Sequence, residues 1–442
     1  MKIERLDLSR PVMAQFEITD ACNHRCLHCY HLDSDISNRP KNTISEAILL
    51  KIAKKIVDAE IFNVVITGGE PLLQQHITRN IIKFFKEHDI QVSINSNLTT
   101  IDGGMIDFLK KYNIPVLTSC PSCVGEKYDY MVGRENFNVF YTNLKEVIGT
   151  GIRCSVNMVI TKDNITDIIE TATKLKEIGC KSFSATPMFL NMDYPRKDLL
   201  LTREEVQKVI NDLLWVHDNL GLTVDILESL PKCVFPETVI NRDYIFLNRK
   251  CQAGRTVVGI SPNGDVRPCS TNSISYGNII KDDIKTIWDN MKAWRSTEYF
   301  PDTCLSCPWI DRCNAGCRIN AKVKYGEWNS SEIWFNGHTP SVQPLSDYVE
   351  PPHHSDETLY VNKRYKVREE YENIYTIYVN RDESFLMVNE FLMNFIRELS
   401  YFDSISLQDL AIHCNTSIDN KDFIDIINLL INKNLISYEK VI

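Results

Sequence analysis

Strand-like apolar segments alternate with amphipathic helical segments through the first half of this 442-residue chain. Because a helix between two strands returns the chain to lay the second strand parallel to the first, this alternation favours a parallel sheet with right-handed crossovers. Six such units predict an α/β fold with an open or partial barrel, whose chemistry gathers at the C-terminal ends of the strands. The predicted strands are 12–18, 62–66, 91–95, 116–119, 153–160 and 182–185, and the helices are 43–60, 77–88, 105–112, 141–148, 165–178 and 203–219.

Three cysteines follow the first predicted strand directly, with the spacing C-x3-C-x2-C: Cys22, Cys26 and Cys29. Three thiolates on one short loop match a [4Fe–4S] cluster with one iron left open, since no fourth cysteine follows nearby. A catalytic metal site keeps a position open for a ligand, whereas a structural site closes its shell. A zinc knuckle is the alternative, but zinc prefers paired C-x2-C units.

The second predicted strand runs straight into Gly68-Gly69-Glu70-Pro71. A glycine pair lets the backbone approach a ligand closely, and the neighbouring carboxylate can accept a charge-assisted hydrogen bond from an ammonium group. The alternative is a plain strand-to-helix turn. Asn97, Ser119 and Asn157 lie at or near the ends of later strands, so they are expected at the same edge of the barrel.

The cysteine loop and the G-G-E-P strand end together resemble the radical S-adenosylmethionine (SAM) superfamily over the first 220 residues. The resemblance implies a partial (β/α)6 TIM-like barrel and a [4Fe–4S] cluster on Cys22, Cys26 and Cys29. It implies that the open iron binds SAM, which the reduced cluster cleaves to a 5′-deoxyadenosyl radical. The implied SAM contacts are Gly68, Gly69, Glu70 and Pro71 for the ammonium group, and Asn97, Ser119 and Asn157 for the ribose and carboxylate.

The chain departs from close members of that superfamily after the fourth strand. They often carry Ser-Leu-Asp-Gly there and then an arginine. This chain has Ser119-Cys120-Pro121-Ser122-Cys123, and Val132 stands at the arginine position. Arg134 is the nearby substitute for the missing contact to the SAM carboxylate.

A second group of cysteines begins where the strand–helix alternation stops. Little helical pattern accompanies them, and such a segment needs bound metal to hold it together, with zinc as the alternative to iron–sulfur clusters. The group consists of Cys233, of Cys251 and Cys269 in C-x12-G-x4-C, and of Cys304, Cys307, Cys313 and Cys317 in C-x2-C-x5-C-x3-C.

This spacing is similar to the SPASM extension of radical SAM peptide-modifying enzymes. The resemblance implies a first auxiliary cluster on Cys233, Cys251, Cys269 and Cys317, and a second on Cys304, Cys307 and Cys313. The family pattern ends with one more cysteine, which this chain lacks. The second site is therefore completed by a residue such as His338 or Asp347, open to a substrate thiolate, or absent, which makes one or two auxiliary clusters.

The C-terminal part has the pattern of a strand-plus-winged-helix domain. From residue 357 onward it contains 9 Lys and Arg against 14 Asp and Glu, a net charge of −5, and an acidic wing is a poor DNA reader. It resembles the PqqD-like precursor-recognition domain. That resemblance implies a leader peptide added as an extra strand to the hairpin edge, against the third helix.

These observations predict four segments: a radical SAM partial barrel at 1–225, a SPASM domain at 226–338, a proline-rich linker at 339–356 and a PqqD-like α+β domain at 357–442. The charged N-terminus does not suit a signal peptide, and no apolar run has membrane-spanning length. The 15 cysteines then suit metal binding in the cytoplasm. The net charge of −9 argues against nucleic acid as a partner.

The combined prediction is a radical SAM maturase that installs a thioether or other cross-link in a ribosomally made precursor peptide. A flavodoxin- or ferredoxin-type protein would supply electrons, and the auxiliary clusters would accept the surplus electron of the cross-link. One alternative is an anaerobic sulfatase-maturase-like enzyme that forms formylglycine, which would not need the docking domain. The other is a non-enzymatic iron–sulfur redox-sensing regulator, against which the G-G-E-P strand end and the acidic wing argue.

Overall fold

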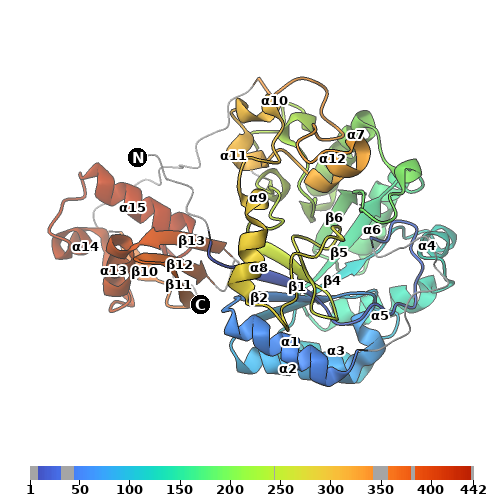
Figure 1. The fold of residues 1–442 in the computed structure, drawn as a ribbon, viewed down its shortest axis with the longest axis horizontal. Helices are drawn as coiled ribbons and strands as arrows, with labels where there is room; N and C mark the ends of the chain where they lie inside the picture. The colour runs from blue at the N-terminus through green and yellow to red at the C-terminus, as the bar shows by residue number, and fades with distance from the viewer. Residues whose placement is uncertain (1–7, 31–43, 243, 342–356, 380–383, 440–442) are drawn as a thin grey trace. The chain divides into compact units, whose positions relative to one another are not determined.

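The computed structural model describes residues 8–30, 44–242, 244–341, 357–379 and 384–439 (Figure 1). Its contacts divide the chain into two compact units, residues 10–344 and residues 1–9 together with 345–442. Most of the predicted linker 339–356, including Asp347, lies outside the described residues. Within the described ranges, no helix is both long and apolar enough to cross a membrane.

A nine-stranded sheet organises the larger unit, in the order β7-β6-β5-β4-β3-β2-β1-β8-β9. Neighbouring strands from β1 to β7 pair in parallel, which confirms the predicted α/β partial barrel. The strands are β1 (Met13–Glu17), β2 (Asn63–Thr67), β3 (Gln91–Asn95), β4 (Val116–Ser119), β5 (Cys154–Ile160), β6 (Ser182–Pro187), β7 (Thr223–Asp225), β8 (Val257–Ile260) and β9 (Val266–Arg267).

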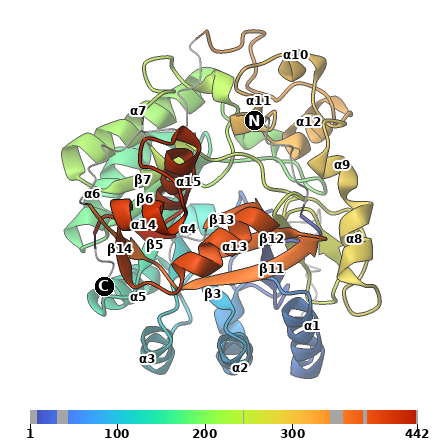
Figure 2. The ribbon, with the colours of Figure 1, turned by 90° about the vertical axis from the view of Figure 1, so that its left-hand side faces the viewer.

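Helices connect these strands and cover the outer face of the sheet, and α1, α2 and α3 lie in a row there (Figure 2). The amphipathic sequence of α2 explains its position, since it buries Ile81, Ile82 and Phe85. Phe85 meets Phe16 of β1 edge-to-face, with 6.3 Å between ring centroids. The helices are α1 (Glu46–Asp58), α2 (Gln75–Glu87), α3 (Gly103–Lys111), α4 (Gly125–Val132), α5 (Phe137–Gly149), α6 (Ile168–Glu177) and α7 (Arg203–Leu220).

The cysteine-rich region continues this sheet, which the sequence did not predict. β8 pairs in parallel with the free side of β1, and β9 returns antiparallel to β8. Gly264 makes the turn between them with φ +92°, a left-handed conformation that glycine adopts without strain. Five short helices follow in a region predicted to be poor in helix: α8 (Ile284–Asn290), α9 (Lys292–Arg295), α10 (Asp302–Leu305), α11 (Ile310–Cys313) and α12 (Arg318–Tyr325).

The smaller unit is the α+β arrangement predicted from the sequence. Two three-stranded sheets, β14-β10-β15 and β11-β12-β13, pack with three helices around an apolar core that includes Ile377, Ile396, Leu410 and Ile427. Its elements are β10 (Thr358–Val361), β11 (Tyr365–Tyr371), β12 (Ile374–Val379), β13 (Ser384–Asn389), α13 (Glu390–Leu399), β14 (Ser404–Ser406), α14 (Leu407–His413), α15 (Lys421–Asn432) and β15 (Ile436–Ser437).

Candidate active site and metal centres

The predicted cluster loop leaves the C-terminal end of β1, the edge where barrel chemistry is expected. Cys22, Cys26 and Cys29 are all partly exposed. The Cys29 amide donates to the Cys26 carbonyl at 3.1 Å, which closes a tight turn between the second and third thiols. The amide of His24 donates to the Cys22 sulfur at 3.4 Å. Such a bond favours the charged form of a thiolate, as a cluster ligand requires.

Helix α4 holds the outer side of this loop. The amides of Arg25 and Leu27 donate to the carbonyls of Val132 and Met131 at 2.8 and 2.9 Å. Val132, which stands at the expected arginine position, is buried and supports the loop through its backbone. The side chain of Arg134 is close enough for its charge, together with burial, to lower the pKa of His24 to about 4.

The glycine pair of the second strand serves the cysteine loop itself. The amides of Gly69 and Glu70 donate to the carbonyls of Thr19 and Ala21 at 2.7 and 2.8 Å. A Cβ at Gly68 would lie 2.3 Å from the Thr19 oxygen, and a Cβ at Gly69 would lie 2.1 Å from the Ala21 oxygen. Glycine is therefore needed here so that two backbones can touch.

Glu70 is a buried carboxylate with three protein donors. Its Oε1 accepts from the amide of Leu72 and the hydroxyl of Ser96, both at 2.8 Å, and its Oε2 accepts from the amide of Asn97 at 2.7 Å. Burial raises its pKa to about 7 although these bonds act in the opposite direction. The carboxylate thus ties β2 to the end of β3, and its predicted contact to an ammonium group stays a prediction.

Asn97 links the end of β3 to the cysteine loop. Its Nδ2 donates to Oδ1 of Asn23 at 2.8 Å, and its Oδ1 accepts from the hydroxyl of Thr99 at 2.7 Å. Thr99 in turn accepts from Nδ2 of Asn23 at 2.7 Å. The side chain of Asn97 is therefore engaged in positioning the loop.

Ser119 and Asn157 are partners across β4 and β5. Ser119 is exposed, whereas Asn157 is buried and accepts from the hydroxyl of Thr186 at 2.8 Å. Polar side chains thus lie on three neighbouring strands: Ser119 at the end of β4, Asn157 in the middle of β5 and Thr186 near the end of β6. Thr186 was missed because a lone threonine near a strand end gives no distinctive sequence signal.

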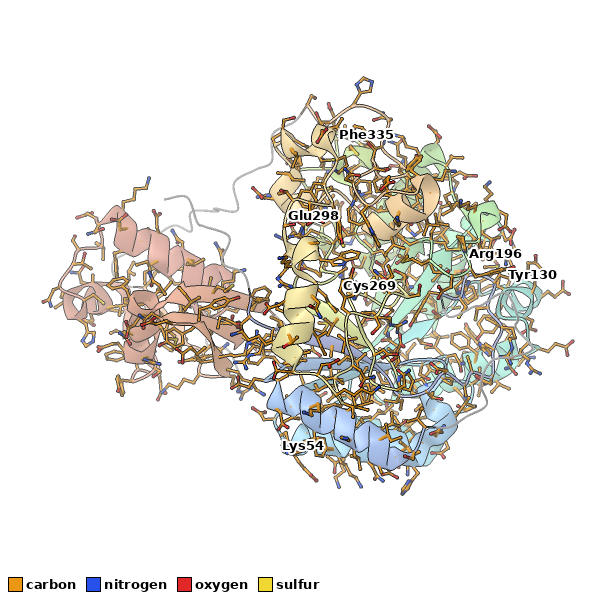
Figure 3. The ribbon with its side chains drawn as sticks, in the orientation of Figure 1. Lys54, Tyr130, Arg196, Cys269, Glu298 and Phe335 are labelled. Atoms are coloured by element: carbon orange, nitrogen blue, oxygen red, sulfur yellow. The ribbon has the colours of Figure 1, made fainter. Side chains whose placement is uncertain are left out.

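The C-x12-G-x4-C spacing has a structural reason. Gly264 turns the chain between β8 and β9, so Cys251 and Cys269, which lie outside the two strands, come to the same open end of the hairpin. The amide of Gly254 donates to the carbonyl of Pro268 at 3.0 Å and holds this end together. Figure 3 shows Cys269 within the larger unit, whereas Lys54 of α1 points away from the sheet.

Cys317 joins this pair. Burial raises the pKa of Cys317 well above its usual value, and the charges of Cys251 and Cys269 raise it further. The charge of Glu228 acts in the same direction on the pKa of all three thiols. The sequence analysis did not find Glu228, since a single acidic residue outside a motif carries no signal.

The remaining thiols of the C-x2-C-x5-C-x3-C block lie near one another. Burial and then the charge of Cys313 raise the pKa of Cys304 to about 11 and also raise the pKa of Cys307. Cys233, predicted to belong to the first cluster, has the charges of Cys313 and Cys304 among the causes of its own raised pKa. His338, one predicted ligand of the second cluster, is exposed.

The donor sets fit clusters of iron and sulfide. Among the described residues, no three Cys, His, Asp or Glu side chains converge to hold a single metal ion. A [4Fe–4S] cluster is bound differently, because each thiolate holds its own iron and the sulfurs stand apart around a cube. All 15 cysteines are free thiols, and three separate sets of them match that chemistry.

Two protein families match this chain. The radical SAM superfamily matches residues 16–189, and the SPASM iron–sulfur cluster-binding domain matches residues 251–314. The subtilosin biosynthesis protein AlbA of Bacillus subtilis is 26% identical over 325 residues, which cover 70% of this chain and 67% of that protein. The mycofactocin maturase MftC of Mycolicibacterium smegmatis is 24% identical over 320 residues, covering 70% and 79%.

Solved structures share the fold. Streptococcus suis SuiB, bound to its precursor peptide SuiA, superposes with a TM-score of 0.62 at 21% identity, covering 74% of this chain and 76% of SuiB. The enzyme anSMEcpe with bound AdoMet superposes with a TM-score of 0.58 at 16% identity, covering 73% and 93%. The family matches over residues 16–189 and 251–314 identify the chain as an enzyme of the radical SAM superfamily that carries a SPASM iron–sulfur domain.

Proposed function

We propose that this enzyme matures a ribosomally made precursor peptide by installing a thioether or another cross-link. The observation that carries the proposal is the cysteine loop, which backbone hydrogen bonds fix beside Gly68–Pro71 at the C-terminal ends of parallel strands. The relatives AlbA and MftC, named for subtilosin biosynthesis and mycofactocin maturation, support the choice of a peptide substrate.

When bound, the cluster and SAM supply a 5′-deoxyadenosyl radical that takes a hydrogen atom from the peptide. The residues of this chain position the reactants. Cys22, Cys26 and Cys29 would hold three irons, the carbonyls of residues 68–70 would accept from the methionyl ammonium, and Ser119 and Asn157 would bind the ribose and carboxylate. Joining a C–H to an S–H removes two hydrogen atoms in total, of which the second leaves as a proton and an electron. The thiols of the SPASM region would hold the clusters that supply an acceptor for that electron.

The smaller unit supplies a docking site for the leader peptide. β11 and β13 are the outer strands of an antiparallel sheet, the type of structure that accepts an extended peptide as an added strand. Phe391 follows β13 and is 70% exposed on α13, so it offers an apolar contact next to the sheet. The unit includes residues 357–442, the segment whose sequence resembles the PqqD-like precursor-recognition domain.

The electron donor and the compartment complete the proposal. A flavodoxin- or ferredoxin-type protein reduces the SAM-binding cluster. The cytoplasm is the compartment that suits 15 free thiols, because they stay reduced there.

The test uses the anaerobically reconstituted full-length enzyme with SAM, a reductant and peptides encoded by small neighbouring reading frames. We expect 5′-deoxyadenosine and a peptide that has lost two hydrogens, both abolished by Cys26→Ala. Cys154→Ala, which changes a thiol of β5 outside the three sets, is the matched control and keeps activity. A peptide aldehyde that reacts with a hydrazide would indicate formylglycine instead, and an enzyme that never cleaves SAM would contradict the proposal.

A further inference from the structure

We propose that Cys233 is the fourth ligand of the second auxiliary cluster, with Cys304, Cys307 and Cys313, and that Cys251, Cys269 and Cys317 hold the first. This division differs from the one that the family resemblance implies. It also supplies the ligand that the missing last cysteine would have provided. The inference rests on the iron–sulfur part of the proposed function and is independent of the peptide substrate.

The backbone before Cys233 lies against the Cys313 turn. The amide of Lys232 donates to the sulfur of Cys313 at 3.4 Å. A Cβ built at Gly316 would lie 3.3 Å from Cβ of Pro231. Cys233 directly follows Lys232. Its backbone therefore lies next to a residue that is in contact with Cys313, a proposed ligand of the second cluster.

The electrostatic neighbours agree with this contact. Burial raises the pKa of Cys233 to about 12, and the thiols whose charges raise it further are Cys313 and Cys304. For Cys317 the corresponding thiols are Cys251 and Cys269. For both Cys233 and Cys317, the thiols whose charges act on the pKa belong to the same proposed set.

The turn between Cys313 and Cys317 explains how residues four apart serve two centres. Asn314, Ala315 and Gly316 are all left-handed, with φ of +53°, +59° and +71°. Such a run reverses the chain direction, and for alanine it is a strained conformation. Nδ2 of Asn314 donates to the carbonyl of Cys251 at 2.9 Å, which fixes the turn between the two cysteine sets.

A buried cation acts on thiols of both sets. Arg318 is 3% exposed and donates to the carbonyls of Tyr299, Trp328 and Ser330 at 3.2, 3.1 and 2.7 Å. Its charge lowers the pKa of both Cys251 and Cys304, against the effect of burial. Arg318 therefore favours the thiolate form in each of the two sets.

The test compares the auxiliary clusters of paired variants. The background is the Cys22/Cys26/Cys29→Ala protein, which keeps only the auxiliary clusters. We expect Cys233→Ala to change the same electron paramagnetic resonance signal and to lose the same iron as Cys313→Ala, with no further loss in the double variant. Cys233→Ala combined with Cys251→Ala should disturb both clusters, and Cys154→Ala should disturb neither. If Cys233→Ala changes the signal that Cys251→Ala changes, or no signal, the proposal is wrong.

A further variant guards against misfolding. Cys233→Ser keeps a weaker oxygen ligand and should shift the second cluster's signal alone, whereas a shift in the first cluster's signal overturns the assignment. These spectra need neither SAM nor peptide. A failure here is therefore distinct from a failure of peptide maturation.

Discussion

Gly69→Ala tests whether the G-G-E-P glycines exist to seat the cysteine loop. The new Cβ would lie 2.1 Å from the carbonyl oxygen of Ala21, 2.6 Å from its carbonyl carbon and 2.9 Å from the oxygen of Asp20. All three are backbone atoms, so no side chain can move aside. The loop that carries Cys22 would have to move away from β2 by about 1 Å to restore ordinary contact distances.

The expected cost follows from that displacement. Overpacking costs about 1–3 kcal/mol. Moving the loop also weakens the hydrogen bonds from Gly69 and Glu70 to Thr19 and Ala21, each worth about 0.5–1.5 kcal/mol. The free energy of unfolding should therefore fall by about 2–6 kcal/mol, a large part of the total stability of an ordinary protein.

The measurement is urea unfolding of the reduced apo protein, together with iron content after reconstitution. Gly103→Ala is the matched control, because its Cβ would meet nothing within 4 Å. We expect Gly69→Ala to unfold at lower urea and to bind less iron, while Gly103→Ala behaves like the wild type. Equal urea midpoints and equal iron content in the two variants would refute the argument that these glycines serve backbone packing.

Three further predictions concern charge, SAM and the leader peptide. Burial raises the pKa of Glu17 to about 7, so the folded carboxyl keeps a proton that the unfolded chain releases, and stability falls as pH rises from about 5 to 7. In the Glu17→Gln variant, the urea midpoint should fall less over this pH range than in the wild type. An equal fall in both proteins would contradict the prediction. Ser119→Ala should weaken SAM binding about fivefold in equilibrium dialysis, because the loss of one hydrogen bond has about that effect. The iron content should not change. An unchanged Kd for SAM would exclude a contact between Ser119 and SAM. Phe391→Glu should weaken leader-peptide binding in fluorescence anisotropy, whereas Trp215→Glu, at a 42% exposed aromatic of the larger unit, should not, and equal effects would place the docking site elsewhere.

Much of the fold was readable from the sequence because its periodicity is local. The predicted strand 91–95 coincides with β3, and the predicted strand 116–119 coincides with β4. Helix α4 was missed, since Gly125–Val132 is short and only weakly patterned. β7, β8 and β9 were missed as well, because they lie at or beyond the end of the strand–helix alternation, where such short strands carry no repeating pattern of their own.

The roles of individual side chains were less predictable. Glu70 was expected to face a ligand, yet three donors from Leu72, Ser96 and Asn97 bind it, and two of them come from a segment more than 20 residues away. The division of the cysteines into clusters has the same difficulty. Spacing along the chain gives only the lengths of the loops between cysteines. In the proposed division, the left-handed turn after Cys313 separates Cys313 from Cys317. No residue pattern predicts three consecutive left-handed residues.

β1 is the element on which the separate thiol sets depend in common. It pairs with β2 on one side and β8 on the other, and the cysteine loop begins directly after it. Two of its polar side chains bind the segment around Cys269, because Glu17 accepts from Arg267 and Gln15 accepts from Ser270, each at 2.5 Å. The loop that carries Cys22 and the segment that carries Cys269 are thus anchored to one hydrogen-bonded strand. If these two segments hold clusters as proposed, the sheet sets the distance that an electron would cross between them.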